Sequence, residues 1–216
     1  MTNLYSKVLD KYQQETLPKL GFLKDEGFYL AGGTALSLQI GHRTSVDFDF
    51  FVKDHFNSEN LINKLKNLFD NKLNITSIEK DTVISIINNV DCSFFWLQYP
   101  LIVEPIELLH TNLASLEDIC AMKLLAVSHR PAIRDYIDIY YLLQKFSLEE
   151  MFGFLEKKYK TANEYLILKA LTYYDDLDEN KNKRPIKMLD PNFSWEKAKT
   201  EILAKVKNYQ LQMLKN

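Results

Sequence analysis

The stretch Phe28-Tyr-Leu-Ala-Gly-Gly-Thr-Ala-Leu-Ser-Leu-Gln-Ile-Gly-His-Arg-Thr-Ser-Val-Asp-Phe-Asp-Phe-Phe51 decides the fold of this chain. It begins with a short apolar segment, residues 28–31, that predicts a β-strand. The chain then turns at Gly32 and Gly33, and apolar residues at helical spacing over 35–40 predict a helix. A strand, a glycine turn and a helix are therefore expected in that order.

The segment 46–50, Val-Asp-Phe-Asp-Phe, alternates strictly between apolar and acidic residues. Because successive side chains of a strand point to opposite faces, Asp47 and Asp49 are expected side by side on one face. Val46, Phe48 and Phe50 are expected to point into a core. Two neighbouring carboxylates repel one another, and one of them would ordinarily take up a proton. A divalent cation such as Mg²⁺, whose ligands are carboxylate, water and phosphate oxygens, removes that repulsion.

The glycine pair supplies a matching phosphate site. Backbone N–H groups at the N-terminus of a helix bind phosphate oxygens, and residues without a side chain allow a close approach. The sequence therefore predicts a metal site and a phosphate site within one segment. The alternative is that Gly32 and Gly33 form only a turn and that the acidic strand is a solvated edge, where carboxylates oppose aggregation.

The order of these motifs resembles the nucleotidyltransferase superfamily that has the DNA polymerase beta-like fold. Its signature is an apolar residue, Gly, then Gly or Ser, a spacer, and Asp-apolar-Asp/Glu-apolar, which Ala31-Gly-Gly and Asp47-Phe-Asp-Phe fit. More narrowly, Ala31-Gly-Gly-Thr-Ala-Leu36 and Gly41-His-Arg-Thr-Ser-Val-Asp-Phe-Asp-Phe-Phe51 resemble the AbiEii family. The members of that family are nucleotidyltransferase toxins of abortive-infection and toxin–antitoxin systems.

This resemblance implies an α+β fold. A polymerase beta-like nucleotidyltransferase core, a mixed sheet flanked by helices, is expected over residues 1–113, and a helical C-terminal domain that completes the nucleotide cleft is expected over 114–216. The implied metal ligands are Asp47 and Asp49, with Mg²⁺ or Mn²⁺ as the cofactor. The implied ligands of the nucleoside triphosphate are Gly32, Gly33, Thr34 and Arg43. His42 is expected to be structural.

A third carboxylate is expected at Asp91. Two β-like runs, 82–87 and 90–98, are joined by Asn88 and Asn89, which suit a type I′ hairpin because Asn tolerates a positive φ. Asp91 opens the second run, and the superfamily takes its third metal ligand and catalytic base from a strand beside the Asp-x-Asp pair. The alternative is an Asp that merely follows a turn. Glu104 and Glu107, near Pro105, stay without an assigned role.

A lysine on one expected helix and an Arg-Asp-x-x-Asp motif on the next extend the resemblance. Lys123 lies near the apolar side of an expected helix from Ser115 to Arg130, and the next helix carries Arg134-Asp-Tyr-Ile-Asp138. In AbiEii-like proteins a Lys and an Arg-Asp-x-x-Asp stretch serve nucleotide binding and activity, so Lys123 would meet the triphosphate and Asp135 or Asp138 would help to place the nucleotide. The alternative is a buried salt bridge from Lys123 to either aspartate.

The remaining pattern predicts ordinary elements that form the core. Helices are expected over 3–20, 58–71, 148–158, 162–174 and 194–214, and a further strand over 73–79. A charged loop follows at 175–185, and the densest cluster of basic residues lies in and beside it. Phosphate contacts need clustered Lys or Arg, so this cluster is the expected contact for an RNA acceptor. The members of the cluster are Lys181, Lys183, Arg184 and Lys187.

Length, composition and charge limit the classes of protein to which this chain can belong. With 216 residues, 46% hydrophobic, the chain can bury a substantial core, and a formal charge of −2 gives no global basic field for nucleic acid. Cys92 and Cys120 lie in apolar contexts without metal-ligand spacing, as expected in a reducing compartment. No signal peptide and no membrane span are evident, so a cytoplasmic protein that does not bind membranes is expected.

Together with these features, the resemblance implies a metal-dependent nucleotidyltransferase that moves a nucleotide from a nucleoside triphosphate to an acceptor and releases pyrophosphate. The resemblance implies tRNA as the acceptor, a role as toxin in an AbiEii-like system, and a cognate antitoxin as partner. Two alternatives remain open at this point: transfer to a protein or to a small molecule such as an aminoglycoside, and a non-catalytic, partner-binding module of the same fold.

Overall fold

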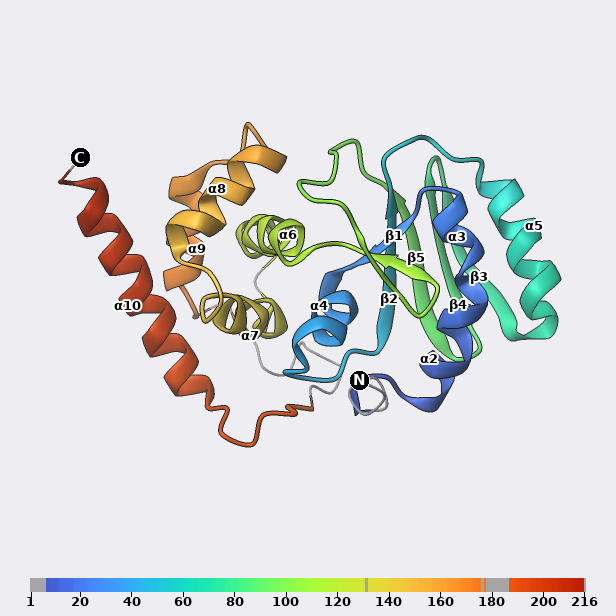
Figure 1. Cartoon of the computed structure of the whole chain (residues 1–216), viewed down its shortest axis with the longest axis horizontal. Helices are drawn as coiled ribbons and strands as arrows, with labels where there is room; N and C mark the ends of the chain where they lie inside the picture. The colour runs from blue at the N-terminus through green and yellow to red at the C-terminus, as the bar shows by residue number, and fades with distance from the viewer. Residues whose placement is uncertain (1–6, 131, 176, 178–186, 216) are drawn as a thin grey trace. The chain divides into compact units, whose positions relative to one another are not determined.

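The protein forms two compact units in a computed structural model that describes residues 7–130, 132–175, 177 and 187–215 (Figure 1). The first unit is Met1–Ser115 and the second is Leu116–Asn216. The first contains all the described strands, and the second is helical in its described part.

The first unit is built on a mixed sheet of seven strands in the order β3-β4-β5-β2-β1-β7-β6. β2 runs parallel to β5, and β1 runs parallel to β7, while the other neighbouring pairs are antiparallel. The strands are β1 (Tyr29–Ala31), β2 (Asp47–Val52), β3 (Leu73–Glu79), β4 (Thr82–Ile87), β5 (Val90–Trp96), β6 (Ile106–Leu108) and β7 (Thr111–Leu113). The predicted mixed sheet flanked by helices is therefore present.

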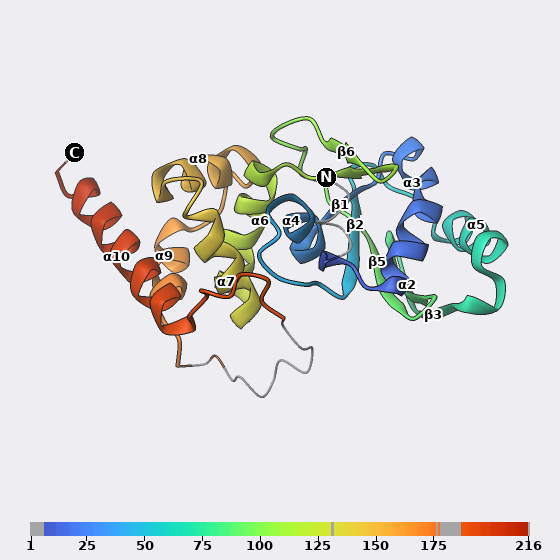
Figure 2. The same cartoon turned by 60° about the horizontal axis from the view of Figure 1, so that its bottom comes forward.

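Helices lie on both faces of this sheet. α4 (Gly32–Ile40) lies against β1 and β2 on one face, and α2 (Lys11–Thr16), α3 (Phe22–Asp25) and α5 (Ser58–Phe69) lie on the other (Figures 1 and 2). The strand, glycine turn and helix expected at the start of the decisive stretch are thus β1 and α4. Because α4 follows β1 directly, its N-terminus lies at the end of β1.

The core of this unit contains aromatic side chains from adjacent strands. Phe48 and Phe50 of β2 are fully buried, and the Phe50 ring stacks on Phe94 of β5 with centroids 5.5 Å apart. The same alternation places Asp47 and Asp49 on the opposite face. The prediction for Val46 was wrong, because this residue precedes β2 and is 37% exposed.

The N-terminal segment differs from the single helix expected over 3–20. Asp10 caps a separate helix, α2, with a capping box to Gln13, and Pro18 lies at the start of a 3₁₀ turn, Leu17–Leu20. Proline lacks the N–H that an α-helix interior requires, so the chain changes helix type there. Leu17 and Leu20, within the range of the expected helix, and Leu23 of α3 are all buried in the core.

The hairpins follow the expected turn chemistry. Asn88 and Asn89 both have positive φ, 49° and 65°, as the type I′ prediction requires. Leu109 and His110 adopt the same left-handed backbone, at 50° and 63°, between β6 and β7. Sequence patterns missed this second hairpin because each of its strands has only three residues and its turn lacks Gly and Asn.

The second unit consists of helices in the order α6 (Leu116–His129), α7 (Ile133–Leu142), α8 (Leu148–Lys158), α9 (Glu164–Thr172) and α10 (Trp195–Met213). Ser147, Asn163 and Ser194 cap the last three by accepting a hydrogen bond from a first-turn N–H. A helical C-terminal part is therefore confirmed. Within the described ranges, no helix is both long enough and apolar enough to span a bilayer.

Candidate active site

The predicted carboxylates lie on adjacent parallel strands of the first unit. In the register of β2 and β5, Asp47 lies opposite Asp91, and Asp49 lies opposite Ser93. Because side chains two residues apart share a face, Asp49 lies on the same face of β2 as Asp47. The fold thus brings together three carboxylates that are more than 40 residues apart at their extremes in the sequence.

A buried thiol lies next to this cluster. Cys92, between Asp91 and Ser93 on β5, has a pKa raised well above its ordinary value, first by burial and then by the charges of Asp91, Asp49 and Asp47. The effect agrees with the register of β2 and β5, which places the three carboxylates close to one another. Their donor atoms are all oxygens, which suits a hard cation such as Mg²⁺ rather than zinc.

The side chains do not by themselves form a closed metal cage. Among the residues that the structure describes, no three His, Cys, Asp or Glu side chains are grouped to hold one metal ion. Mg²⁺ sites in phosphoryl-transfer enzymes use one or two carboxylates and complete the shell with water and substrate phosphates. The pair of carboxylates on β2 fits that pattern, while a third ligand at Asp91 stays a prediction.

The N-terminus of α4 lies against the carboxylates. A Cβ atom on Gly32 would be only 2.8 Å from the Asp49 Oδ2 atom, and the φ of Gly32 is +68°, in the left-handed region. Only glycine satisfies both conditions without strain. The first N–H groups of a helix have no acceptor within the helix, so an anion-binding group and the acidic pair are adjacent.

Arg43 and Ser45 lie beside the second glycine. The Arg43 guanidinium is 2.5 Å from the position that a Gly33 Cβ would take, and Nη1 donates to the Thr44 carbonyl oxygen at 2.9 Å. Ser45 Oγ donates to Asp47 Oδ1 at 3.2 Å. A positive side chain, a helix N-terminus and a hydroxyl thus adjoin the carboxylates.

Three predicted residues of this region, Thr34, His42 and Arg43, are buried, and Arg43 is 3% exposed. Thr34 is 1% exposed, and its hydroxyl donates to the Asp47 carbonyl oxygen, so it fastens α4 to β2. A role of Thr34 toward the triphosphate stays a prediction. His42 is 2% exposed, in agreement with an expected structural residue.

The second unit contains the predicted lysine and aspartates in one cluster. Lys123 Nζ on α6 lies 2.6 Å from Asp135 Oδ1 and 2.7 Å from Asp138 Oδ2, both on α7. The lysine side chain is 8% exposed and the aspartate side chains are fully buried. Arg130 Nε adds a longer contact of 4.0 Å to Asp135 Oδ2. The salt bridge that the sequence left as an alternative is therefore present.

The chain matches known proteins over nearly its whole length. The model of a family described as "Nucleotidyl transferase AbiEii toxin, Type IV TA system" matches residues 22–102 and 85–210. The chain belongs to the AbiEii nucleotidyltransferase toxin family. An uncharacterized protein of Aquifex aeolicus, aq_aa25, is 34% identical over 213 residues, which cover 93% of this chain and 97% of the relative.

Solved structures support the same fold for this AbiEii chain. A candidate nucleotidyltransferase from Helicobacter pylori has a TM-score of 0.58 at 19% identity, over 96% of this chain and 98% of its own. MenT4, a nucleotidyltransferase toxin from Mycobacterium tuberculosis, has a TM-score of 0.52 at 17% identity, over 91% and 82%. The predicted polymerase beta-like fold is confirmed.

Other acidic and basic predictions have different outcomes in the AbiEii chain. Glu107 on β6 pairs with Lys24 at 2.5 Å, and the Lys24 hydrogen bond and charge hold the pKa of Glu107 below its ordinary value. Glu104 is exposed and lines the pocket described below. Of the basic cluster, Lys181, Lys183 and Arg184 lie outside the described residues, and Lys187 is exposed.

Sequence reasoning about the AbiEii chain missed two polar residues near the predicted sites. Ser45 was not identified, although its place two residues before Asp47 puts it on the same side of the chain. Asp118, near the start of the helix expected from Ser115, was given no role, yet it pairs with Lys158 of α8 at 2.7 Å, with both side chains fully buried. No sequence signal links residues 40 positions apart in this way.

Proposed function

We propose that this AbiEii chain uses Mg²⁺ to transfer a nucleotide from a nucleoside triphosphate to tRNA, as the cytoplasmic toxin of a toxin–antitoxin or abortive-infection pair. The observation that carries the proposal is the meeting of Asp47, Asp49 and Asp91 with the glycine-started helix α4 on one face of the sheet. Such a face offers cation ligands and phosphate ligands side by side.

The reaction is an in-line displacement at the α-phosphorus. A hydroxyl oxygen of the acceptor forms a bond to that phosphorus, the bond to the bridging oxygen of the β-phosphate breaks, and pyrophosphate leaves with the electron pair. The proton of the hydroxyl passes to a base, and Asp91 is the proposed base. Bound Mg²⁺, held by Asp47 and Asp49, would supply charge stabilisation for the attacking and leaving oxygens.

The residues around α4 bind the triphosphate in this proposal. Backbone N–H groups of Gly32, Gly33 and Thr34 donate to phosphate oxygens, because glycine allows a close approach at the positive end of the helix. Arg43 contributes a guanidinium, which matches phosphate oxygens in geometry and charge. Ser45 holds the Asp47 carboxylate through its hydrogen bond and so orients the predicted cation ligand.

In this proposal the Lys123 cluster also binds the nucleotide. Its ammonium donates to two fully buried carboxylates, which fix its position. A lysine held in this way is preorganised for an anionic group, since little side-chain freedom is left to lose on binding. Asp135 and Asp138 are therefore positioning residues for Lys123 in this proposal.

One experiment tests donor, acceptor and metal together. Purified protein is incubated with Mg²⁺, each labelled nucleoside triphosphate in turn, and total tRNA, and the products are separated on a denaturing gel. Label on tRNA that requires Mg²⁺ and is lost in Asp47→Ala/Asp49→Ala supports the proposal. Label that migrates with protein or with an added aminoglycoside would identify that molecule, and not tRNA, as the acceptor. If the protein bound no nucleoside triphosphate in the presence of Mg²⁺, the proposed enzymatic function would be wrong. The chain would then be a partner-binding module of the same fold.

A further inference from the structure

The face with the carboxylates continues into a row of aromatic rings. In the sheet register Tyr29 of β1 lies opposite Phe51 of β2, and Phe51 lies opposite Phe95 of β5. Phe51 and Phe95 are each two residues beyond Asp49 and Ser93, so they share the face of the carboxylates. The ring centroids are 6.1 Å apart for Tyr29 and Phe51, and 5.5 Å for Phe51 and Phe95.

Two of the three rings, Phe51 and Phe95, lie at the edge of solvent, while Tyr29 is only 4% exposed and anchors the row in the core. Phe51 and Phe95 are half-buried, in contrast with Phe50 and Phe94 on the opposite face, which are fully buried. Ile84 of β4, which pairs with Ser93, is also exposed. Partly exposed rings beside an acidic catalytic face need a reason, because burial elsewhere would stabilise the fold more.

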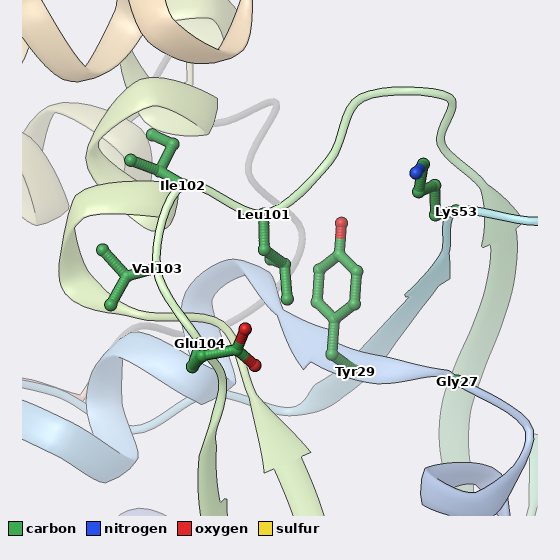
Figure 3. A pocket seen from close by; sticks show the side chains of 7 residues that line it. All are labelled: Gly27, Tyr29, Lys53, Leu101, Ile102, Val103 and Glu104. Carbon is green, nitrogen blue, oxygen red and sulfur yellow. The ribbon is translucent and has the colours of Figure 1, made fainter.

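A pocket opens beside the row. It has a volume of about 280 Å³ and lies between the start of β1, the end of β2 and the segment after β5 (Figure 3). Tyr29 rises from β1 beside Leu101, with its hydroxyl directed toward the space between that segment and Lys53 (Figure 3). The residues that line it are Gly27, Tyr29, Lys53, Leu101, Ile102, Val103 and Glu104. The pocket therefore combines a ring, an ammonium and a carboxylate.

The position of the pocket relative to the carboxylates is set by β2. A strand rises about 3.3 Å per residue, so Phe51 lies about 7 Å and Lys53 about 13 Å beyond Asp49. The N-terminus of α4 lies at the Asp49 end of this line, as the close approach of Gly32 to Asp49 shows. Along β2, the rings and Lys53 thus lie on one side of Asp49, and the proposed triphosphate ligand Thr34, whose hydroxyl donates to the Asp47 carbonyl oxygen, lies toward the other.

In-line displacement requires this kind of separation. The attacking oxygen and the leaving pyrophosphate lie on opposite sides of the phosphorus. If α4 binds the pyrophosphate portion, the acceptor approaches from the side of Phe51. Rings that stack bases and a cation that contacts a phosphate are the usual components of a single-stranded RNA site.

We propose that the row of Tyr29, Phe51 and Phe95, together with the pocket at Lys53 and Glu104, binds the 3′-terminal nucleotides of a single-stranded RNA acceptor. Phe51 and Phe95 stack on bases, Lys53 contacts a backbone phosphate, and Glu104 accepts hydrogen bonds from amino groups on base edges. The inference rests on the proposed function, since it names the acceptor side of the same reaction.

Steady-state kinetics with Lys53→Gln and Phe51→Leu test the inference. Lys53 is exposed, so its replacement removes a charge without disturbing the core. Each variant should raise the KM for the RNA acceptor about tenfold and leave the KM for the nucleoside triphosphate close to that of the wild type. The matched control is Lys66→Gln, which removes the same charge from an exposed position on α5. An increase confined to the KM of the nucleoside triphosphate would assign the rings to the donor base instead and overturn the inference.

Crosslinking separates failure of the inference from failure of the proposed function. A short RNA with 4-thiouridine as its 3′-terminal nucleotide is irradiated with the wild-type protein, and the crosslinked peptide is identified by mass spectrometry. Crosslinks to 51–53 or 101–104 support the site. Crosslinks elsewhere, from an RNA that the protein does label, contradict only this inference. Absence of label on any RNA contradicts the proposed function and, with it, the acceptor assigned here.

Discussion

Gly32 shows how one residue links the fold to the chemistry. Its left-handed backbone lets the chain pass from β1 into α4, and its missing side chain leaves room for the Asp49 carboxylate 2.8 Å from where a Cβ would be. A glycine elsewhere in the chain lacks both features: Gly153, within α8, has no heavy atom within 4 Å of a Cβ built on it. The two residues therefore form a matched pair.

Gly32→Ala should lower stability and nucleotidyl transfer, while Gly153→Ala should do neither. A left-handed alanine costs roughly 1–2 kcal/mol, and the new methyl group would also displace the Asp49 carboxylate. In a helix interior, alanine is favoured over glycine by roughly 0.5–1 kcal/mol, so Gly153→Ala should raise the midpoint of thermal unfolding. Thermal unfolding and the tRNA labelling assay measure both effects. A fully active Gly32→Ala protein would show that this close approach has no role in catalysis.

Comparison of two buried lysines of the second unit distinguishes a structural role from a functional one. Lys123 and Lys158 are both nearly or fully buried and both lie 2.6 to 2.7 Å from a buried carboxylate, but only Lys123 is a proposed nucleotide-binding residue. Removal of one partner leaves a buried charge without its main counter-charge, which typically destabilises a protein by roughly 3–5 kcal/mol. Loss of activity in a Lys123 variant is therefore not evidence of function unless stability is measured too.

Lys123→Met and Lys158→Met should both lower the free energy of unfolding by several kcal/mol, roughly 3–5 kcal/mol each. Per folded molecule, only Lys123→Met should lose nucleotidyl transfer, because Lys158 contacts no proposed substrate group. Urea unfolding gives the fraction folded, and labelling of tRNA under the same conditions gives the rate. Equal rates for the two variants after this correction would leave Lys123 with a structural role alone.

At the scale of elements, the sequence predicts the helices, strands and turns whose conformation depends on neighbouring residues in the chain. β3 and β4 have the bounds expected from their alternation, and the positive φ of Asn88 and Asn89 follows from side chains that tolerate it. The acidic face of β2 was predictable because alternation alone fixes it. The meeting of Asp47 with Asp91 was predictable only from the family resemblance, because strand order depends on contacts distant in sequence.

Elements that depend on distant contacts were predicted less well. β6 and β7 are too short to show a period, and β7 is placed by its parallel pairing with β1 rather than by its own sequence. The pair of Asp118 and Lys158 joins α6 to α8, and each residue alone looks like an ordinary surface charge in the sequence. The pocket beside Tyr29 likewise combines three segments that no local pattern connects.

The cap of α8 gives this element a measurable dependence on pH. Glu150 accepts hydrogen bonds from the Ser147 N–H and hydroxyl, and these lower the pKa of Glu150 from its ordinary value of 4.5. Since the pKa is lower in the folded state, the cap stabilises the protein fully above the unfolded-state pKa, and this stabilisation is lost as the pH falls through the folded-state pKa. The difference in unfolding free energy between the wild type and Glu150→Ala should therefore shrink from pH 6 to pH 3, as measured by urea unfolding. A difference that is constant over this range would contradict the assignment. Glu149→Ala, at the neighbouring exposed position, is the control.

At the scale of the whole molecule, the two units divide the proposed work. The first contains the carboxylates, the glycine-started helix and the aromatic row, and the second contains the Lys123 cluster. Membership of a toxin family implies that this work is harmful to the cell unless it is restrained by an antitoxin. Toxicity and transfer should then depend on the same atoms.

Expression of the chain without its antitoxin should therefore arrest growth, and Asp49→Ala should relieve the arrest. The carboxylate of Asp49 is a proposed ligand of the cation and lies beside Gly32, so its removal disables the chemistry without emptying the core. Growth curves after induction measure the effect, with soluble protein levels matched by immunoblotting. Asp54→Ala is the control, because this exposed residue lies beyond the end of β2 and has no proposed role in the site. If the wild type and Asp49→Ala arrested growth equally at equal soluble levels, the growth arrest would result from binding to a cellular partner and not from nucleotidyl transfer. The toxin would then act as a partner-binding module, even in a protein that labels tRNA in vitro.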